Sequence, residues 1–308
     1  MLSQNTEHNP DSRYRIKTAT RKELDKVLEW AAAEGWNPGL QDAESFYATD
    51  PNGFLIGTLN GEPIASISAV KYDEKFGFIG FYIVLPDYRG LGYGLQIWKA
   101  GLSYLQERTV GLDGVLQQQN NYVKSGFQLA HRNIRYEGRR DTDAIQQNID
   151  SDFAEQIAGR MSPSANLVPL SSVPFRAVLD YDRALFLSER AYFLKGWIGT
   201  DRHVAVGAMY QQALAGYGVL RPCQQGYKIG PLLADSPELA EAIFLALATQ
   251  VEPHSFFYLD VPEVNSAAVA IAKKYQMSVV FETARMYKRT PPELPLNRIF
   301  GITSFELG

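Results

Sequence analysis

The first third of the chain alternates between the two-residue period of strands and the three- to four-residue period of helices. Thr20 and Glu23 form a capping-box pattern before an apolar stripe, and Gly35 follows that stripe as a stop signal. Asn60-Gly61 is the preferred two-residue turn of a β-hairpin. The pattern therefore predicts a strand, two helices and three antiparallel strands, in the order 15–19, 20–34, 42–49, 53–59, 64–72 and 76–85.

A glycine-rich bend follows the last of these strands. After Pro86 the chain reads Arg89-Gly90-Leu91-Gly92-Tyr93-Gly94, and a helical stripe of apolar residues then runs over 95–105. Glycine permits positive φ and lets a ligand approach the main chain. No acidic residue occurs between Asp87 and Glu107, so the positive end of that helix carries no carboxylate. These features predict a site where backbone N–H groups bind a phosphate-bearing ligand.

Two common phosphate motifs do not fit this bend. A P-loop needs Gly-Lys-Ser/Thr, whereas Gly94 is followed by Leu95 and Gln96. A dinucleotide fingerprint needs a differently spaced third glycine and an acidic residue about 20 positions later. The pattern Val84-x-Pro86 followed by Arg-x-x-Gly-x-Gly instead resembles motif A of the GNAT N-acetyltransferase superfamily. In that family the bend holds the pyrophosphate of acetyl-coenzyme A, so the resemblance implies acetyl-CoA as the acyl donor.

The resemblance also implies which residues contact the donor. The pyrophosphate would lie on the amides of Leu91–Gly94, and the pantetheine arm would run beside the preceding strand. A main-chain N–H near Val84 would stabilise the oxyanion that forms during acyl transfer. The expected donor-binding residues are Ile83, Val84, Arg89, Gly90, Leu91, Gly92, Tyr93 and Gly94.

A second segment, Tyr122-Val123-Lys124-Ser125-Gly126-Phe127, resembles another signature of the same family. In relatives its tyrosine protonates the departing thiolate, so the resemblance implies that Tyr122 is the catalytic general acid. Its position about 30 residues after the bend favours this role over simple packing at a helix end. Many relatives carry an Asn well upstream of this tyrosine. Here Asn120 and Asn121 adjoin it, and neither is assigned a role.

The sequence does not identify a general base, because the strand at 76–85 carries no carboxylate. Water relays or one of three acidic side chains remain as alternatives, namely Glu34, Asp73 and Glu74. Trp36 and Asn37 lie in the loop that borders the acceptor in relatives, so we expect them to contact substrate, with a core role for Trp36 as the alternative. The expected acceptor is an amine of a small molecule or a peptide, which attacks the thioester directly.

The element pattern recurs in the second half. The first half is expected to finish with strands at 115–118 and 129–136, the latter closing its sheet. The later segments predict a helix at 181–197 and then strands and helices at 204–210, 214–220, 227–233, 236–248, 256–261, 265–275 and 279–287. The whole chain thus resembles tandem GNAT proteins, an α+β fold with two GNAT-like domains, each a mixed, mostly antiparallel sheet flanked by helices. The expected divisions are a tail at 1–13, the acetyltransferase domain at 14–138, a linker at 139–172, the second domain at 173–290 and a C-terminal tail at 291–308.

The second copy lacks the features of a phosphate site. Pro237 removes an amide from the corresponding helix start, and Ser236 can cap the amides that remain. Asp235 and Glu238 add negative charge there, which would repel a phosphate. We therefore expect a degenerate second copy that shapes the acceptor pocket, mediates dimerisation, or does both.

Composition excludes several other classes of protein. The chain has 308 residues and a net charge of −4, without a basic cluster that would bind nucleic acid. Cys223 is the single cysteine, so no internal disulfide is expected, and four dispersed histidines give no metal spacing. No apolar run approaches the roughly 18 residues of a membrane span. Because 1–11 is polar and lacks a signal-peptide core, a cytoplasmic protein is expected.

Two alternatives to an enzyme remain at this stage. The first copy could hold acyl-CoA as a non-catalytic sensor while the second contacts a partner protein. Retention of Tyr122 favours the enzyme, because a sensor needs no acid at the sulfur. The other alternative is a homodimer built through the apolar tail at 296–307, which contains Phe300 and Phe305. That tail could equally pack against its own domain.

Overall fold

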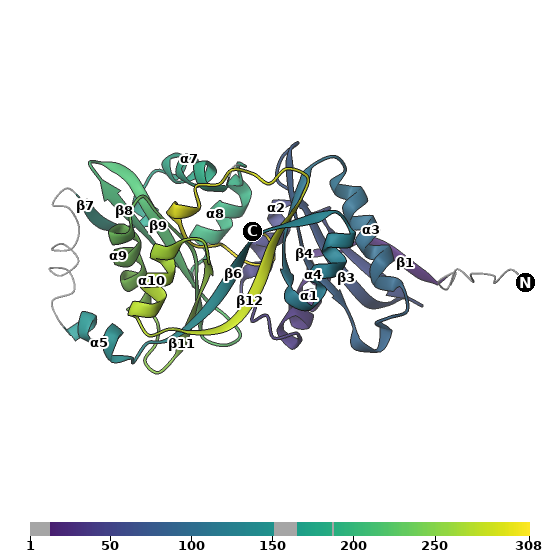
Figure 1. Ribbon diagram of the computed structural model, residues 1–308, viewed down its shortest axis with the longest axis horizontal. Helices are drawn as coiled ribbons and strands as arrows, with labels where there is room; N and C mark the ends of the chain where they lie inside the picture. The colour runs from purple at the N-terminus through teal and green to yellow at the C-terminus, as the bar shows by residue number, and fades with distance from the viewer. Residues whose placement is uncertain (1–12, 151–164, 187) are drawn as a thin grey trace, which may run out of the picture.

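The structure, a computed structural model, describes residues 13–150, 165–186 and 188–308. The tail prediction for 1–13 therefore lies almost entirely outside the described residues. The two halves of the chain stand side by side as two lobes of sheet and helix (Figure 1). One sheet of 13 strands runs through both lobes within the described residues, so the α+β class is confirmed. No helix in the described ranges combines the length and the apolar character needed to cross a bilayer.

The first half follows the predicted order closely. The N-cap Thr20 accepts a hydrogen bond from the Glu23 amide, and Glu23 accepts one from the Thr20 amide, which confirms the capping box. Asn60 and Gly61 both have positive φ, as the predicted hairpin turn requires. The elements are β1 (Tyr14–Thr18), α1 (Arg21–Ala33), α2 (Asp42–Thr49), β2 (Phe54–Leu59), β3 (Glu62–Lys71), β4 (Phe76–Val84), η1 (Pro86–Tyr88), α3 (Tyr93–Leu105), β5 (Thr109–Val115), η2 (Leu116–Gln118), α4 (Gln119–Lys124) and β6 (Phe127–Arg139).

The strand predicted at 115–118 is wrong. The strand is β5 at 109–115, and the residues after it form a short 3-10 turn. Two glycines in β5 conceal the apolar alternation. A Cβ at Gly111 would lie 2.9 Å from the ring of Phe78, and one at Gly114 would lie 2.3 Å from the ring of Tyr122. These glycines are thus required by side chains that pack onto the strand.

The second half contains more regular structure than the sequence predicted. The single helix expected at 181–197 is two helices, α7 and α8. The described part of the expected linker at 139–172 includes α5 and the edge strand β7, which pairs with β8. The elements are α5 (Asp143–Asp150), β7 (Ala165–Pro169), η3 (Leu170–Ser172), α7 (Phe175–Phe186), α8 (Ala191–Gly199), β8 (Val204–Tyr210), β9 (Ala213–Pro222), β10 (Tyr227–Ala234), α9 (Pro237–Ala248), β11 (Phe256–Pro262), α10 (Ser266–Lys274), β12 (Ser278–Lys288), η4 (Leu296–Arg298) and β13 (Ile299–Gly301).

The two halves exchange their last long strands. The sheet order across the junction is β5-β12-β6-β11, so β12 of the second half lies between two strands of the first (Figure 1). β6 in turn pairs with β11 of the second half. The prediction that the strand at 129–136 closes the sheet of the first half is therefore wrong. A two-residue period identifies a strand and its buried face, but it does not say which strand will pair with it.

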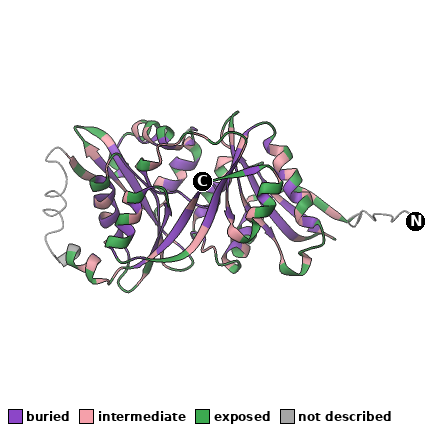
Figure 2. Cartoon of the chain, viewed as in Figure 1, coloured by how far each residue is buried: buried purple, intermediate pink, exposed green. Residues whose placement is uncertain are grey.

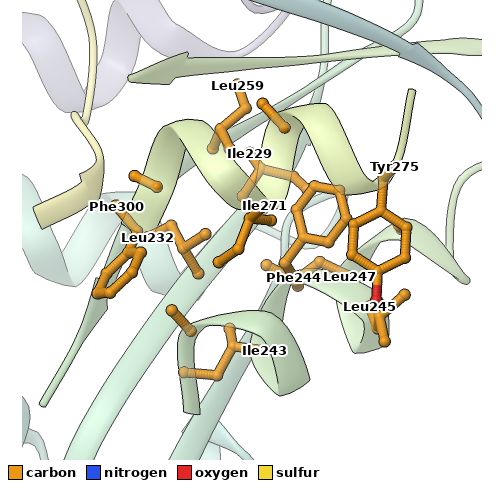
Figure 3. Packing of buried hydrophobic residues seen from close by; sticks show 14 of the residues in the cluster. Ile229, Leu232, Ile243, Phe244, Leu245, Leu247, Leu259, Ile271, Tyr275 and Phe300 are labelled. Atoms are coloured by element: carbon orange, nitrogen blue, oxygen red, sulfur yellow. The ribbon is translucent and has the colours of Figure 1, made fainter. Parts of the chain in front are cut away.

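Buried residues run along the strands of both lobes (Figure 2). In the second half, α9 and α10 cover the sheet, and Phe244 packs on Tyr275 with ring centroids 5.1 Å apart (Figure 3). A further cluster contains residues of both halves. In it Phe46 of α2 stacks on Phe193 and Trp197 of α8, with centroid separations of 6.4 and 5.8 Å. The lobes therefore share a hydrophobic core.

Residues 299–308 of the C-terminal tail are buried at the junction of the lobes, where Figure 1 shows the chain ending. β13 pairs with β10, and the Asn265 side chain donates hydrogen bonds to the carbonyls of Leu296 and Ile299. Nearer the end, the Tyr72 hydroxyl donates to the Leu307 carbonyl at 2.6 Å. The apolar tail thus packs within its own chain and contacts both halves.

Candidate functional site

The site begins where β4 and β5 separate. The two strands pair in parallel only from Phe76 to Ile79 on β4. Beyond that point the pairing of β4 with β3 shifts register, and Phe81 adopts a φ of 43°. An extra residue of this kind bends a strand away from its neighbour. The resulting opening is a cavity of about 680 Å³, bordered by β4, β5, the glycine bend, α4 and the C-terminal tail.

The glycine bend has the geometry that anion binding needs. Gly90 and Gly92 have φ of 77° and 86°, and a Cβ at either would meet nothing within 4 Å. Gly92 is the N-cap of α3, and no side chain caps the helix there. The first turn of α3 carries no acidic residue. The first amides of a helix have no intrahelical partner, so those of α3 can donate to a ligand.

Arg89 holds the bend in place. Its Nε donates to the Val84 carbonyl at 2.8 Å, and its Nη2 forms an ion pair with Glu34 at the end of α1. The guanidinium thereby links the bend, the end of β4 and the first helix. Because its charge is already compensated by Glu34, Arg89 positions the backbone amides rather than supplying an unpaired cation.

Tyr122 lines the same cavity as the glycine bend, but on the α4 side. It is on α4, and its ring packs against Trp98 and Phe127, with centroid separations of 5.4 and 6.5 Å. Trp98 is itself held by a hydrogen bond from its Nε1 to the Ser125 hydroxyl at 3.2 Å. Burial raises the pKa of the Tyr122 phenol well above its usual value, and the nearby Tyr82 adds to the shift. The phenol therefore keeps its proton at neutral pH and can act as a donor.

The cavity brings together most of the residues predicted from the sequence. Those that line it are Trp36, Ile83, Val84, Arg89, Gly90, Gly92, Gly94 and Tyr122. Three predicted residues lie elsewhere. The side chain of Leu91 is exposed, and the ring of Tyr93 is buried against Tyr14 at 4.8 Å, so both could contribute only main-chain groups. The Asn37 side chain donates to the Gln225 carbonyl at 2.9 Å and accepts from its amide at 2.8 Å.

The three acidic side chains left open as bases are all engaged. Glu34 lines the cavity but pairs with Arg89. Asp73 accepts from the amides of the turn that precedes β4, at the far end of that strand from the bend. Glu74 lies in the same turn and pairs with Arg108. None of the three presents an unpaired carboxylate to the cavity.

β12 and the tail add residues that sequence reasoning missed. Phe281, Phe305 and Glu306 line the cavity on the side of Trp36. The Trp36 carbonyl accepts hydrogen bonds from Arg135 of β6 at 2.9 Å and from Lys228 of β10 at 3.2 Å, so one strand from each half of the chain fixes this wall. The available signal for Glu306 was an acidic residue between the apolar Phe305 and Leu307, and local periodicity cannot connect it to a site formed by distant segments of the chain.

The corresponding opening of the second half is filled. β10 and β11 pair in parallel only over 227–229, after which β13 takes up the freed edge of β10. The Ile302 amide donates to the Asp260 carbonyl at 2.9 Å, so the tail bridges both strands. Ser236 caps α9 by accepting from the Leu239 amide, as predicted, and Pro237 occupies the first turn.

Family models match both halves of the chain. The Acetyltransferase (GNAT) family model matches residues 19–127, and an Acetyltransferase (GNAT) domain model matches residues 178–301. The chain is also similar to the holothin acyltransferase of Pseudoalteromonas sp. (strain SANK 73390). The two are 32% identical over 297 residues, which cover 95% of this chain and 94% of that protein.

Solved structures share the whole architecture. A candidate acetyltransferase from Pyrococcus horikoshii superimposes with a TM-score of 0.77 at 23% identity and covers 100% of both chains. A tandem GNAT protein from the clavulanic acid biosynthesis pathway gives a TM-score of 0.60 at 13% identity, with 91% of this chain and 100% of that chain covered. At these sequence identities, the similarity shows only that the folds are alike.

Proposed function

Because this chain belongs to the GNAT family as a tandem pair of GNAT domains, and is an acyl-CoA-dependent acyltransferase, we propose that it transfers an acetyl group from acetyl-CoA to an amine. The observation that carries the proposal is one continuous cavity that joins the uncapped start of α3 to Tyr122. The donor carries a diphosphate that is joined to its thioester by the pantetheine arm, and the two parts of the cavity suit these two groups.

In this proposal the bend binds the donor. Its diphosphate accepts hydrogen bonds from the amides of 91–94, where the helix dipole also favours negative charge. The pantetheine arm passes along Ile83 and Val84, which line the cavity after β4 has left β5. A main-chain N–H near Val84 stabilises the oxyanion. Holding donor and acceptor in one cavity removes much of the entropic cost of their encounter.

Tyr122 is proposed as the general acid. The amine attacks the thioester carbonyl directly, and the C–S bond breaks as the tetrahedral intermediate collapses. A thiolate leaves more readily when a proton is delivered to it, and the buried phenol holds that proton at neutral pH. A protein that only sensed acyl-CoA would gain nothing from such a donor at the sulfur.

The second half is proposed to be a degenerate copy that does not bind coenzyme. Its opening is occupied by β13, and the start of α9 is capped by Ser236 with Glu238 in the first turn. Its contribution is to the wall of the cavity in the first half, through Phe281 and the tail.

The acceptor is proposed to be an amine on a small molecule or a peptide. The relative that matches 95% of this chain is named a holothin acyltransferase, and that name describes the relative only. Three aromatic residues line the acceptor side here, Trp36, Phe281 and Phe305, so a flat or apolar group beside the amine would pack well. We still predict that the protein forms a homodimer and that it is located in the cytoplasm.

Calorimetry with acetyl-CoA and the full chain tests the donor site. We expect saturable binding with one donor per chain, and then release of free thiol when amines are supplied. If acetyl-CoA binds but no thiol is released with any amine of a broad panel, the result favours a non-catalytic sensor of acyl-CoA. Absence of binding would overturn the proposal.

A further inference from the structure

Glu306 is a buried acidic residue without a hydrogen-bond partner. It is 3% exposed, and neither carboxylate oxygen has a partner within the described part of the chain. A buried polar group left in this way costs free energy, so its presence calls for an explanation. Glu306 lines the cavity that also contains Tyr122 and the glycine bend.

The tail places Glu306 against the point where the cavity opens. A Cβ on Gly80 of β4 would lie 2.0 Å from the Glu306 carbonyl oxygen, so the two backbones are in direct contact. The next residue, Phe81, has the positive φ that starts the divergence of β4 from β5. Trp36 and Phe305 line the same side of the cavity. Glu306 therefore stands on the acceptor side, beside the strand along which the donor is proposed to lie.

Glu306 also belongs to a buried cluster of charged side chains, in which the other carboxylates are paired with arginine. Two pairs in this cluster are complete, because Arg135 binds Asp260 and Arg221 binds Asp42, each at 2.7 to 2.8 Å. The third cation is Lys228, which is 2% exposed and forms no ion pair within the described residues. The charged and titratable groups that interact with one another across this cluster are Asp42, Arg135, His203, Arg221, Cys223, Lys228, Tyr258, Asp260 and Glu306.

The cluster leaves one carboxylate free to contact a ligand. It contains three basic side chains, Arg135, Arg221 and Lys228, and three acidic ones. Burial, and then repulsion from Arg135, lowers the pKa of Lys228 to about 8. Of those carboxylates, Asp42 and Asp260 have both oxygens engaged by arginine. Glu306 alone among the three has both oxygens available.

We infer that Glu306 accepts the proton of the incoming acceptor amine and so is the general base of the reaction; the inference rests on the proposed function. An ordinary amine enters as an ammonium, and one N–H proton passes to the Glu306 carboxylate. The freed lone pair forms the N–C bond. As the C–S bond breaks, sulfur takes the proton of Tyr122, and a second N–H proton returns to the Tyr122 oxygen. Glu306 then releases its proton to water, which leaves the amide and the free thiol.

The test compares two probe amines in the full-length protein. Phenethylamine is an ammonium at neutral pH, whereas aniline is already neutral. In Glu306→Gln we expect kcat/KM for phenethylamine at pH 7 to fall about 100-fold or more, the usual scale of a lost base. The loss with aniline should be below about fivefold, because its nitrogen needs no deprotonation before attack. In the variant, the phenethylamine rate should also rise about tenfold per pH unit from 7 to 9, following the neutral amine.

Controls separate chemistry from folding. Glu306→Asp keeps the carboxylate and should recover part of the phenethylamine rate. Glu293→Gln changes an exposed acid of the same segment and should match the wild type. Acetyl-CoA affinity and melting temperature are measured for each variant, so that a general loss of structure is distinguished from a loss of chemistry.

The outcomes distinguish this inference from the proposed function. If the wild type releases thiol and Glu306→Gln loses the same factor with both amines, or loses nothing, the inference is overturned while the function stands. If the wild type binds acetyl-CoA but turns over neither amine, phenethylammonium binding is measured in the presence of CoA. At least tenfold weaker binding by Glu306→Gln then supports the inference. Equal binding, or none in either protein, overturns it.

Discussion

Arg135 of β6 and Asp260 of β11 are cross-strand neighbours, and the guanidinium donates two hydrogen bonds of 2.7 Å to the carboxylate. Arg285 of β12 and Asp113 of β5 repeat this arrangement, with hydrogen bonds of 3.0 and 2.6 Å. Each exchanged strand is thus tied by one buried bidentate pair to the half that it joins. This symmetry explains why the lobes form one sheet, and it predicts that they unfold together.

The first prediction concerns Asp260→Asn. The change leaves Arg135 buried without its counter-charge, so we expect a loss of about 3–5 kcal/mol in the free energy of unfolding. Urea denaturation, followed by circular dichroism and by fluorescence, measures it. Asp180→Asn breaks an exposed helical pair with Arg176 and should cost less than about 1 kcal/mol. Two separate transitions in the wild type would contradict a single cooperative unit.

The second prediction concerns the glycine bend. Gly92→Asp places a carboxylate at the start of α3, where it would cap the free amides and repel a diphosphate. We expect the Kd for acetyl-CoA to rise at least about tenfold, because the anion loses both the amides and the favourable dipole. Calorimetry measures the change. Gly61→Ala is the matched control, since Gly61 also has positive φ, 91°, with open space around it. The control should lose about 1–2 kcal/mol of stability and no donor affinity.

The third prediction concerns Tyr122→Phe. Removal of the hydroxyl should lower kcat by roughly 10²- to 10⁴-fold, because the thiolate then leaves without its acid. Acetyl-CoA affinity should stay within about twofold, since the ring still packs against Trp98 and Phe127. Single-turnover thiol release and calorimetry measure the two quantities. Tyr47→Phe, outside the cavity, should behave as the wild type. Unchanged turnover in Tyr122→Phe would remove the acid assignment.

The fourth prediction concerns pH and His131 of β6. Burial, followed by the charge of Arg285, lowers its pKa from 6.5 to about 4. The unfolded chain binds a proton before the folded one does, so this residue costs stability as pH falls from 6.5 to 4 and has no effect above that window. The difference of about 2.5 units corresponds to roughly 3 kcal/mol.

His131→Gln should therefore lose less stability than the wild type between pH 7.5 and pH 4.5. Parallel urea titrations at the two pH values give that difference. Identical pH dependence in the wild type and His131→Gln would show that another group carries the acid sensitivity.

Local sequence patterns predict most elements and the donor side of the site. The capping box at Thr20, the hairpin at Asn60-Gly61 and the bend at Gly90 and Gly92 depend on backbone preferences of a few adjacent residues, and the structure has all of them. The position of β5 is not predicted correctly because Gly111 and Gly114 are required by aromatic rings of other segments, which pack onto the strand. This requirement does not appear in the strand's own alternation of apolar and polar residues.

Helix periods, turn residues and caps act over short stretches of chain, so most elements, the uncapped helix start and the two similar halves can be predicted from the order of residues alone. The exchange of β6 and β12, the filling of the second opening by β13 and the position of Glu306 at the cavity of the first half become visible only in the folded chain. Pairing partners and buried charges depend on surfaces brought together from more than 100 residues apart, where apolar burial and charge compensation, rather than local conformational preference, fix the arrangement.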